Sequence, residues 1–459
     1  MPSRDRRVVV VANRLPIAYD SDTGEWRTSP GGLVSALTPI LQRTRGSWVG
    51  WSGISDEKFD PFTHSDINQV PVTMTQEEYE DFYVGFCNGT LWPLYHDSIR
   101  APQFHRHWWR PYEAVNRRFA ETAAETLGRD DVAWVQDYQL QLVPQMIRHA
   151  KDVHRIGFYL HIPFPPVELF AKLPWRRQVL EGLLGADVLA FQSRSSRTNF
   201  AVAARRLAGA TGSSSRLEWD HRTVTLQVAP IGIDTSVFDD LAMSEETARD
   251  AEEIRSQLGD PEVVVLGVDR LDYTKGIDFR MRALQTLFEH RPELIGKVMF
   301  VQIAVPSRED VEEYRQIRAD IERLVGRING DFAEVGRPPI HYLHRSVPIE
   351  ELVAYYRAAD VMFVTPLRDG MNLVAKEYVA TRFDETGALI LSEFAGAAEE
   401  FTQSYLVNPY DLEAMARTLA DAIETASVRG NRRMRALRRS VGSHDVFWWA
   451  EQCLGALGL

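Results

Sequence analysis

The sequence contains only two cysteines, Cys87 and Cys453, which lie far apart and do not form a CxxC pair. We therefore expect neither a disulfide framework nor a zinc site built from thiolates, and this cysteine usage fits a cytoplasmic protein best. Long apolar runs are also missing. The start, "MPSRDRRVVVVANRL", has only about five consecutive apolar residues, too few for a signal peptide or a membrane span, so no membrane association is expected.

Positively charged residues are also outnumbered. The chain has 52 Lys and Arg residues and 64 Asp and Glu residues, which gives a formal net charge of −12. This balance argues against a nucleic-acid partner and against an anionic membrane surface. A local basic pocket that binds a phosphorylated small molecule is still compatible with it.

Several motifs of cofactor and hydrolase chemistry are absent. The chain has no GxGxxG fingerprint, no Walker A sequence and no GxSxG elbow, so neither a nicotinamide nor a flavin cofactor is expected and a serine hydrolase is not indicated. Metal-site candidates are weak: "HRH" at 105–107 lacks an obvious third ligand and is predicted to be a polar loop or edge strand, and Asp20-Ser21-Asp22 lies in a turn rather than after a buried strand. We expect no cofactor and no metal.

What the chain does contain is an alternation of short β-branched runs with longer segments of helical periodicity, which predicts βαβ units and parallel sheets. At 459 residues it is long enough for about two or three domains. We predict two doubly wound α/β domains, at 1–235 and 236–439. Their predicted strands are 8–11, 132–135, 156–160, 188–191 and 225–229 in the first, and 263–268, 298–303, 340–343, 361–364 and 389–391 in the second.

In open α/β sheets, ligands bind beyond the carboxyl ends of the strands, where helix N-termini present N–H groups to anions. The stretch "VMFVTPLRDGMNLVAKEYV" lies at such an end and places Arg368, Asp369 and Gly370 between a strand and a helix. If this helix starts near Met371, its first N–H groups can cradle a phosphate, and Glu377 can accept a hydrogen bond from a ribose. In the alternative, Asp369 only caps the helix and Glu377 is solvated.

Cations follow two other strands of the second domain. The motif "DRLDYTKG" brings Arg270 and Lys275 to the same edge of the sheet, which suits a diphosphate leaving group on which negative charge accumulates. The alternative is a solvated pair of cations. Arg308, after the next strand, can grip a second phosphate or can form a surface ion pair with Glu309 or Asp310.

The first predicted domain also has candidate binding residues just after its strands. Arg14 follows its first strand, and Gly31 and Gly32 open a helix whose backbone a phosphate can approach closely. Asp137 and His161 each come just past a strand end, where a carboxylate and an imidazole can bind sugar hydroxyls or handle protons. For His161 the alternative is a satisfied core histidine.

Taken together, these motifs resemble the trehalose-6-phosphate synthase family of retaining glycosyltransferases over nearly the whole chain. The landmarks are "NRLP", "GGL", "WVGWSG", "GFCNGTLWP", "DYQL", "LHIPFPP", "DRLDYTKG", "GRINGDF", "TPLRDGMNLVAKEYV" and "LSEFAGAAEE". The resemblance implies a GT-B fold, in which two Rossmann-like domains face each other across an active-site cleft. It also implies that a C-terminal helix, at about 440–459, packs back on the first domain. One departure is Gln136, where many relatives would have His.

The resemblance further implies which ligand each candidate residue contacts. The nucleotide-sugar donor is assigned to Gly32, His161, Arg270, Lys275, Asp369, Gly370, Met371, Asn372, Leu373 and Glu377. The sugar-phosphate acceptor is assigned to Arg14, Trp51, Tyr83, Trp92, Asp137 and Arg308. Within these sets the catalytic residues are Asp137, His161, Arg270, Lys275 and Asp369. Without this resemblance, Tyr83 and Trp92 would be interpreted as core aromatics.

The implied activity is transfer of glucose from a nucleotide-glucose to glucose 6-phosphate with retention of configuration, without a metal, giving α,α-trehalose 6-phosphate. UDP-glucose is the default donor, GDP-glucose is the main competitor, and ADP-glucose is also to be tested. Three alternatives are a pseudo-glycosyltransferase that joins cyclitols, a catalytically silent sugar-phosphate sensor, and a glycogen-synthase-like polymer transferase. Oligomeric state is left open, with a homo-oligomer as one candidate.

Overall fold

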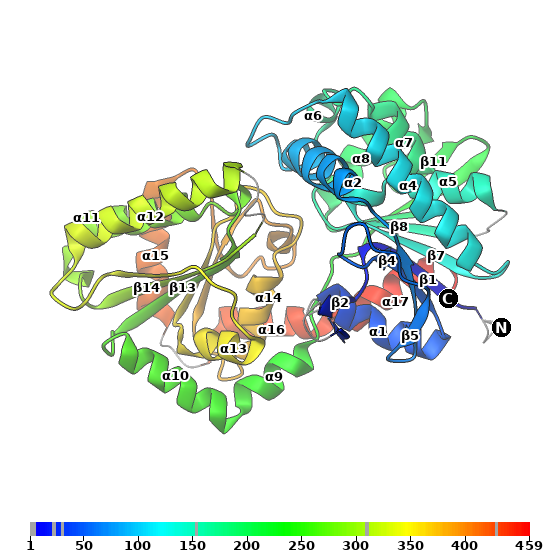
Figure 1. Cartoon of the computed structure of the whole chain (residues 1–459). Coiled ribbons are helices and arrows are strands. Elements are labelled where there is room, and N and C mark those ends of the chain that lie inside the picture. The colour runs from blue at the N-terminus through cyan, green and yellow to red at the C-terminus, as the bar shows by residue number, and fades with distance from the viewer. Residues whose placement is uncertain (1–5, 21–23, 29–31, 152–154, 308–311, 427–429) are drawn as a thin grey trace. The chain divides into compact units, whose positions relative to one another are not determined.

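The structure, a computed structural model, describes residues 6–20, 24–28, 32–151, 155–307, 312–426 and 430–459 (Figure 1). The chain divides into two compact units. The first comprises Met1–Ile231 and Val446–Leu459, and the second comprises Gly232–Asp445. Each unit contains its own sheet of mainly parallel strands with helices on its faces, which is the doubly wound α/β arrangement predicted for both halves of the chain.

The described strands of the first unit form a ten-stranded sheet in the order β10-β11-β12-β9-β8-β7-β1-β4-β6-β5. These strands are β1 (Val8–Arg14), β4 (Ser47–Trp51), β5 (Phe62–His64), β6 (Ile67–Val72), β7 (Val132–Gln136), β8 (Ile156–Leu160), β9 (Val188–Phe191), β10 (Thr211–Gly212), β11 (Arg216–Trp219) and β12 (Arg222–Val228). The helices are α1 (Gly32–Thr44), α2 (Gln76–Glu78), η1 (Tyr79–Leu91), α3 (Trp92–Tyr95), α4 (Arg106–Thr126), η2 (Tyr138–Leu140), α5 (Val143–Ala150), α6 (Val167–Phe170), α7 (Arg176–Leu184), α8 (Arg194–Leu207) and α17 (Val446–Ala456).

The C-terminal helix α17 belongs to this first unit. Its Trp449 is fully buried and packs against Trp134 of β7 and Tyr159 of β8, with ring centroids 5.3 and 5.0 Å apart. Aromatic side chains of this size bury large areas, so this packing ties the end of the chain to the centre of the first sheet.

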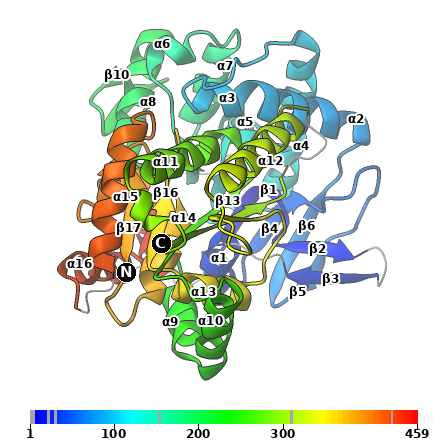
Figure 2. The same cartoon turned by 90° about the vertical axis from the view of Figure 1, so that its left-hand side faces the viewer.

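A two-stranded hairpin, β2 (Ile17–Asp20) with β3 (Glu25–Thr28), lies beside β5 in the first unit (Figure 2). Trp26 of the hairpin contacts Phe62 of β5, with 4.9 Å between ring centroids. This hairpin is absent from the predicted strands.

The second unit contains a six-stranded parallel sheet in the order β15-β14-β13-β16-β17-β18. The strands are β13 (Val263–Arg270), β14 (Val298–Val305), β15 (Ile340–Leu343), β16 (Val361–Val364), β17 (Ala388–Ser392) and β18 (Tyr405–Val407). The helices are α9 (Thr235–Met243), α10 (Glu245–Gln257), η3 (Tyr273–Lys275), α11 (Ile277–His290), η4 (Pro292–Leu294), α12 (Glu312–Phe332), α13 (Ile349–Ala358), α14 (Leu373–Thr381), η5 (Gly396–Glu399), α15 (Leu412–Ala426) and α16 (Arg432–Ser443). Figure 1 shows α11 and α12 on one side of β13 and β14, and α10 and α13 on the other.

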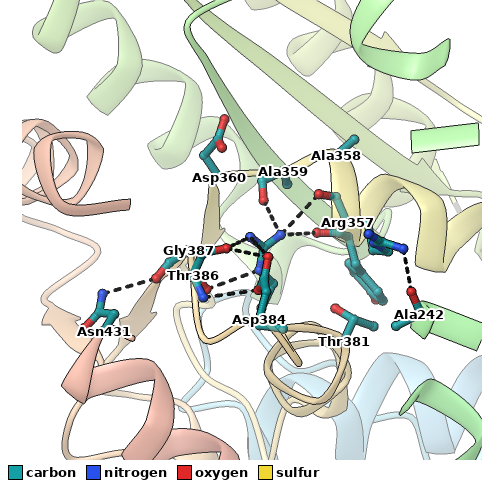
Figure 3. A network of polar contacts seen from close by, with 12 residues as sticks. Ala242, Arg357, Ala358, Ala359, Asp360, Thr381, Asp384, Thr386, Gly387 and Asn431 are labelled. Carbon is teal, nitrogen blue, oxygen red and sulfur yellow. Dashed lines mark hydrogen bonds and ion pairs between the residues drawn. The ribbon is translucent and has the colours of Figure 1, made fainter. Parts of the chain in front are cut away.

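Where α13 ends, just before β16 begins, the buried guanidinium of Arg382 forms hydrogen bonds with the last carbonyl groups of the helix. It donates to the backbone oxygens of Tyr356, Arg357 and Ala359 at 3.3, 3.2 and 3.0 Å, and it also contacts Thr386. Figure 3 shows the carbonyl groups at the end of α13 turned toward this network. The last carbonyls of a helix have no partner within the helix, so one arginine here replaces several missing hydrogen bonds.

Arg382→Met is therefore expected to destabilise the second unit by about 3 kcal/mol, because it leaves several buried carbonyls without donors. Calorimetry of the full chain measures this as a lower unfolding temperature for one transition. The matched control is Arg318→Met, which removes an exposed i,i+4 pair with Glu322 and is expected to cost less than about 0.5 kcal/mol. Equal effects of both substitutions would contradict this role for Arg382.

Candidate active site

The first cluster of predicted site residues lies in the second unit, where β13 and β16 end. Arg270 is the last residue of β13 and is exposed, and the following turn η3 carries Lys275. Gly276 comes next with a φ of 62°, and a Cβ at this position would lie 2.3 Å from the backbone oxygen of Thr365. Glycine is thus required for the β13 loop to lie against the end of β16.

Lys275 and Asp369 come from these two different loops and form an ion pair, with 2.6 Å between Nζ and Oδ2. Each side chain keeps only 13% of its surface exposed. The Asn372 amide donates to the same carboxylate oxygen at 3.2 Å. Two predicted site residues, far apart in the sequence, therefore lie side by side where low exposure strengthens their attraction.

The helix after β16 starts two residues later than predicted, at Leu373 rather than near Met371. Asn372, in a left-handed conformation with φ of 89°, is its N-cap, and its side-chain oxygen accepts a hydrogen bond from the Ala375 N–H at 3.0 Å. The alternative in which Asp369 caps this helix is therefore wrong. The helix N-terminus still presents backbone N–H groups and the positive end of its dipole at the strand-end cluster.

The turn before α14 rests on the segment that follows β17. The Gly396 N–H donates to the Asp369 backbone oxygen at 3.2 Å, and the Ala397 N–H donates to that of Met371 at 2.9 Å. A Cβ on Gly396 would lie 1.9 Å from the Gly370 backbone oxygen. The motif "LSEFAGAAEE" therefore supplies a glycine that lets the two backbones touch.

Glu377 lies in the second turn of α14 and is partly buried, so the alternative of a solvated side chain is wrong. The Tyr356 hydroxyl donates to its carboxylate at 2.7 Å. Burial raises the pKa of the Glu377 carboxyl, and the tyrosine bond partly opposes this shift. Its neighbour Lys376 points elsewhere and pairs with Glu400 at 2.7 Å.

A buried network beneath the β13 loop contains none of the residues predicted from the sequence. Arg280 of α11 has no exposed surface and pairs with Asp269, one residue before Arg270, at 2.6 Å. Its guanidinium also donates to Thr365 and Gln302 at 3.0 and 2.8 Å. Burial raises the pKa of Asp269, while Arg280 opposes the shift. The network fixes the loop that carries the two predicted phosphate-binding cations.

In the first unit, the structure brings Asp137 and His161 together at the ends of β7 and β8. The Asp137 carboxylate accepts a hydrogen bond from the His161 backbone N–H at 3.1 Å. Asp137 has a φ of 70°, and its own N–H donates to the Tyr159 backbone oxygen at 2.8 Å. The His161 ring lies 3.0 Å, through Nε2, from the Gln136 side-chain oxygen.

Arg14 and Trp51, two further predicted residues, meet at the ends of β1 and β4. The Arg14 guanidinium carbon lies 4.7 Å from the centroid of the Trp51 ring, within the range of a cation–π interaction. Trp51 contacts Tyr79, with 5.3 Å between centroids, and Tyr79 stacks on Tyr83 at 5.4 Å. Arg14, Trp51 and Tyr83 thus belong to one chain of contacts.

Trp92, the remaining aromatic candidate, is 6% exposed and begins α3 directly after the π-helix η1. Its ring centroid lies 5.7 Å from that of Tyr138, whose hydroxyl donates to Asn88 of η1 at 3.0 Å. Because Tyr138 follows Asp137 directly, Trp92 packs against the segment that carries this carboxylate. π-helical segments are rare and occur frequently at functional sites.

Some predicted features lie elsewhere. Gly32 is the first residue of α1, while Gly31 and Arg308 lie outside the described residues. The "HRH" motif is not a loop or an edge strand, because His105 precedes α4 and His107 lies within it.

Across the described ranges, no group of three or more His, Cys, Asp or Glu side chains is arranged to hold a metal ion. In the same ranges, no helix combines the length and apolar character needed to cross a bilayer.

The chain is similar to known proteins over nearly its whole length. Residues 6–458 match the family model of glycosyltransferase family 20. A trehalose-6-phosphate synthase of Mycolicibacterium paratuberculosis is 52% identical over 465 residues, covering 98% of this chain and 94% of that protein. Among solved structures, one is an α,α-trehalose-phosphate synthase (UDP-forming) of Burkholderia xenovorans in complex with glucose 6-phosphate. It has a TM-score of 0.90 at 35% identity and covers 98% of this chain and all (100%) of its own.

A second solved structure, from E. coli, contains bound UDP-2-fluoro glucose and has a TM-score of 0.90 at 33% identity, covering 98% of both chains. These similarities extend through both units rather than through one of them. Together with the parallel sheets described above, they confirm the fold class expected from the sequence motifs.

Proposed function

Because this chain belongs to glycosyltransferase family 20 and is therefore a glycosyltransferase, we propose that it makes α,α-trehalose 6-phosphate. Glucose is transferred from a nucleoside-diphosphate glucose to glucose 6-phosphate with retention of configuration. The single observation that carries the proposal is the cluster of Lys275, Asp369 and Asn372 at the N-terminus of α14, next to the strand end that carries Arg270.

This cluster supports a role in holding the donor. The positive end of α14 and the two cations Arg270 and Lys275 suit a diphosphate, which gains negative charge as its bond to glucose breaks. Asp369 offers a carboxylate for the glucose hydroxyls, and its bond to Lys275 fixes the orientation of both side chains. Glu377, partly buried and held by a tyrosine, is oriented to accept from the ribose.

A different set of residues supports a role in holding the acceptor. Arg14 presents a fork of donors that matches a phosphate, and the aromatic rings of Trp51, Tyr83 and Trp92 can enclose a hexose. Asp137 is assigned to an acceptor hydroxyl and His161 to a hydroxyl of the donor glucose. Arg308 belongs to the same proposal as a second phosphate ligand.

The proposed reaction is a substitution on one face of the sugar. The bond between the anomeric carbon and the β-phosphate oxygen breaks first, and its electron pair goes to the phosphate, leaving an oxocarbenium-like glucosyl group. The acceptor hydroxyl attacks from the same face, and its proton passes to the departing phosphate oxygen. The protein supplies orientation and charge stabilisation, which requires cations and helix N-termini rather than an enzymic nucleophile.

We propose UDP-glucose as the preferred donor, with GDP-glucose as its competitor. Support comes from two relatives, one described as UDP-forming and one with bound UDP-2-fluoro glucose. A cytoplasmic location is part of the proposal, supported by two buried cysteines that form no disulfide.

The test is release of nucleoside diphosphate from UDP-, GDP- and ADP-glucose, each with and without glucose 6-phosphate. The proposal predicts release that depends on glucose 6-phosphate and is fastest with UDP-glucose. Binding of both ligands without release would support a catalytically silent sensor instead. Release that needs a cyclitol rather than glucose 6-phosphate would support a pseudo-glycosyltransferase, and release that needs a glucan would support a polymer transferase.

A further inference from the structure

Gln136 is the last residue of β7, has 1% of its surface exposed, and faces the ring of His161 from the neighbouring strand end. Its side-chain oxygen lies 3.0 Å from Nε2 of His161. An amide oxygen only accepts hydrogen bonds, so in this arrangement Nε2 carries the proton and Nδ1 presents a lone pair. The other half of the amide, Nε2 of Gln136, is buried without a partner in the described part of the chain.

The surroundings of the His161 ring disfavour a positive charge. Its centroid lies 4.5 Å from that of Tyr159 and 6.2 Å from that of Trp449 of α17. Burial lowers the pKa of His161 to about 3. The ring is therefore neutral at physiological pH.

Among the described residues of the first unit, the titratable neighbours of this ring are Asp137 and Tyr159. The Asp137 carboxylate accepts from the His161 backbone N–H rather than from the ring. The Tyr159 hydroxyl is directed away from the ring: its oxygen lies 2.8 Å from the Gln192 side-chain oxygen and 2.5 Å from the Ala229 backbone oxygen, and its single proton is donated on that side. The polar contact of Nε2 is thus made by a neutral amide, which orients the ring without supplying a negative charge that would favour the imidazolium.

We propose that Gln136 is a positioning residue, which holds His161 as the neutral tautomer protonated on Nε2 beside the transferred glucose. The inference rests on the proposed function, because that function places His161 at the donor sugar. A neutral ring accepts a hydrogen bond from a sugar hydroxyl through Nδ1. An imidazolium at this position would repel the oxocarbenium-like glucosyl group and slow the transfer by roughly tenfold or more.

The state of the ring can be measured without any turnover. Selective ¹⁵N labelling of histidine, with His161→Asn used to assign the signal, reports which ring nitrogen carries the proton and how it titrates. The expected result is a proton on Nε2 and no titration of His161 between pH 5 and 8. A proton on Nδ1, or titration within that range, would overturn the proposal.

Two substitutions then test the catalytic consequence. Gln136→Glu keeps an accepting oxygen but adds a negative charge, which raises the pKa of His161. Since the neutral ring is the active form, kcat of this variant should fall as the pH falls and should recover to within about threefold of wild type at high pH. Gln136→Leu removes the acceptor, and kcat should fall about tenfold at every pH with an unchanged KM for glucose 6-phosphate.

A matched control separates this effect from the cost of burying a carboxylate in the sheet. Gln69 of β6 is also 1% exposed and lies in the same sheet, with β4, β1 and β7 between it and β8. Gln69→Glu should lower the unfolding temperature, but its kcat should not fall as the pH falls in the way expected for Gln136→Glu. If both variants of Gln136 lowered kcat equally at all pH values, or if neither did, Gln136 would have only a structural role. If the wild-type protein turned over no donor, the proposed function would fail, while the NMR titration would still determine the state of His161.

Discussion

Lys275→Ala is expected to lower kcat/KM for the nucleotide-glucose donor by about 10²- to 10³-fold. The substitution removes a cation from the proposed diphosphate site at the point where charge accumulates on the leaving group, an interaction that is strongest in the transition state. It also leaves the Asp369 carboxylate without its 2.6 Å ion pair, so the group assigned to the glucose hydroxyls loses its orientation. Steady-state kinetics at saturating glucose 6-phosphate measure the effect, and most of it should appear in kcat.

The control for this prediction is Lys297→Ala. Lys297 belongs to the same unit and forms an exposed pair with Glu262 at 3.7 Å, so its loss should change kcat/KM by less than twofold. Lys275→Arg is informative as well, because it keeps the charge but changes the shape of the donor group. Wild-type kinetics in Lys275→Ala, in protein that remains folded, would remove Lys275 from the donor site.

Arg14→Ala is expected to raise the KM for glucose 6-phosphate by about 10- to 100-fold. A charge-assisted hydrogen bond to a phosphate contributes about 1.5–3 kcal/mol, and each 1.4 kcal/mol corresponds to a factor of ten. The KM for the donor should change little. The sharpest readout compares kcat/KM for glucose 6-phosphate with that for unphosphorylated glucose, because only the first should depend on Arg14.

Arg117→Ala serves as the matched control for Arg14. Arg117 lies on α4 of the same unit and pairs with Glu113 at 3.3 Å, with more than half of its side chain exposed (57%). Its loss should leave the preference for the phosphorylated acceptor intact. If Arg14→Ala kept the wild-type ratio of the two acceptors, the acceptor phosphate would bind elsewhere.

The central strands of both sheets could be predicted from the sequence because they are buried on both faces. Runs such as "VVVVA" and "VMFV" read as continuous apolar segments, and β1 and β16 form where they were expected. Strands with mixed composition were missed. β4 is "SWVGW", β6 is "INQVPV", and β18 is only three residues long, so none of them gives a clear strand signal by itself.

The chemistry of the candidate site was more predictable than its geometry. Charged residues at strand ends, such as Lys275 and Asp369, stand out because their position in the fold follows from the strand pattern. Their ion pair could not be predicted, because the sequence of each loop does not show which residue of the other loop it contacts. Arg280 was missed for a related reason: an arginine within an amphipathic helix usually lies in solvent, and only the tertiary structure turns this one toward Asp269.

The positions of special backbone geometry show a similar limit. Asn372 could be recognised as part of a turn, and asparagine tolerates the left-handed region, but its role as the helix cap appears only in the structure. The close approach of Gly396 to Gly370 depends on two segments that are distant in the sequence. Such contacts are set by packing between elements rather than by local propensity.

The most direct test of the central claim is ¹H NMR of the product that the wild-type protein forms from UDP-glucose and glucose 6-phosphate. The proposed function predicts a phosphorylated disaccharide in which both anomeric protons show the small couplings of α linkages, formed in step with UDP. A product with a β linkage, or free glucose released without a disaccharide, would contradict retaining transfer to glucose 6-phosphate.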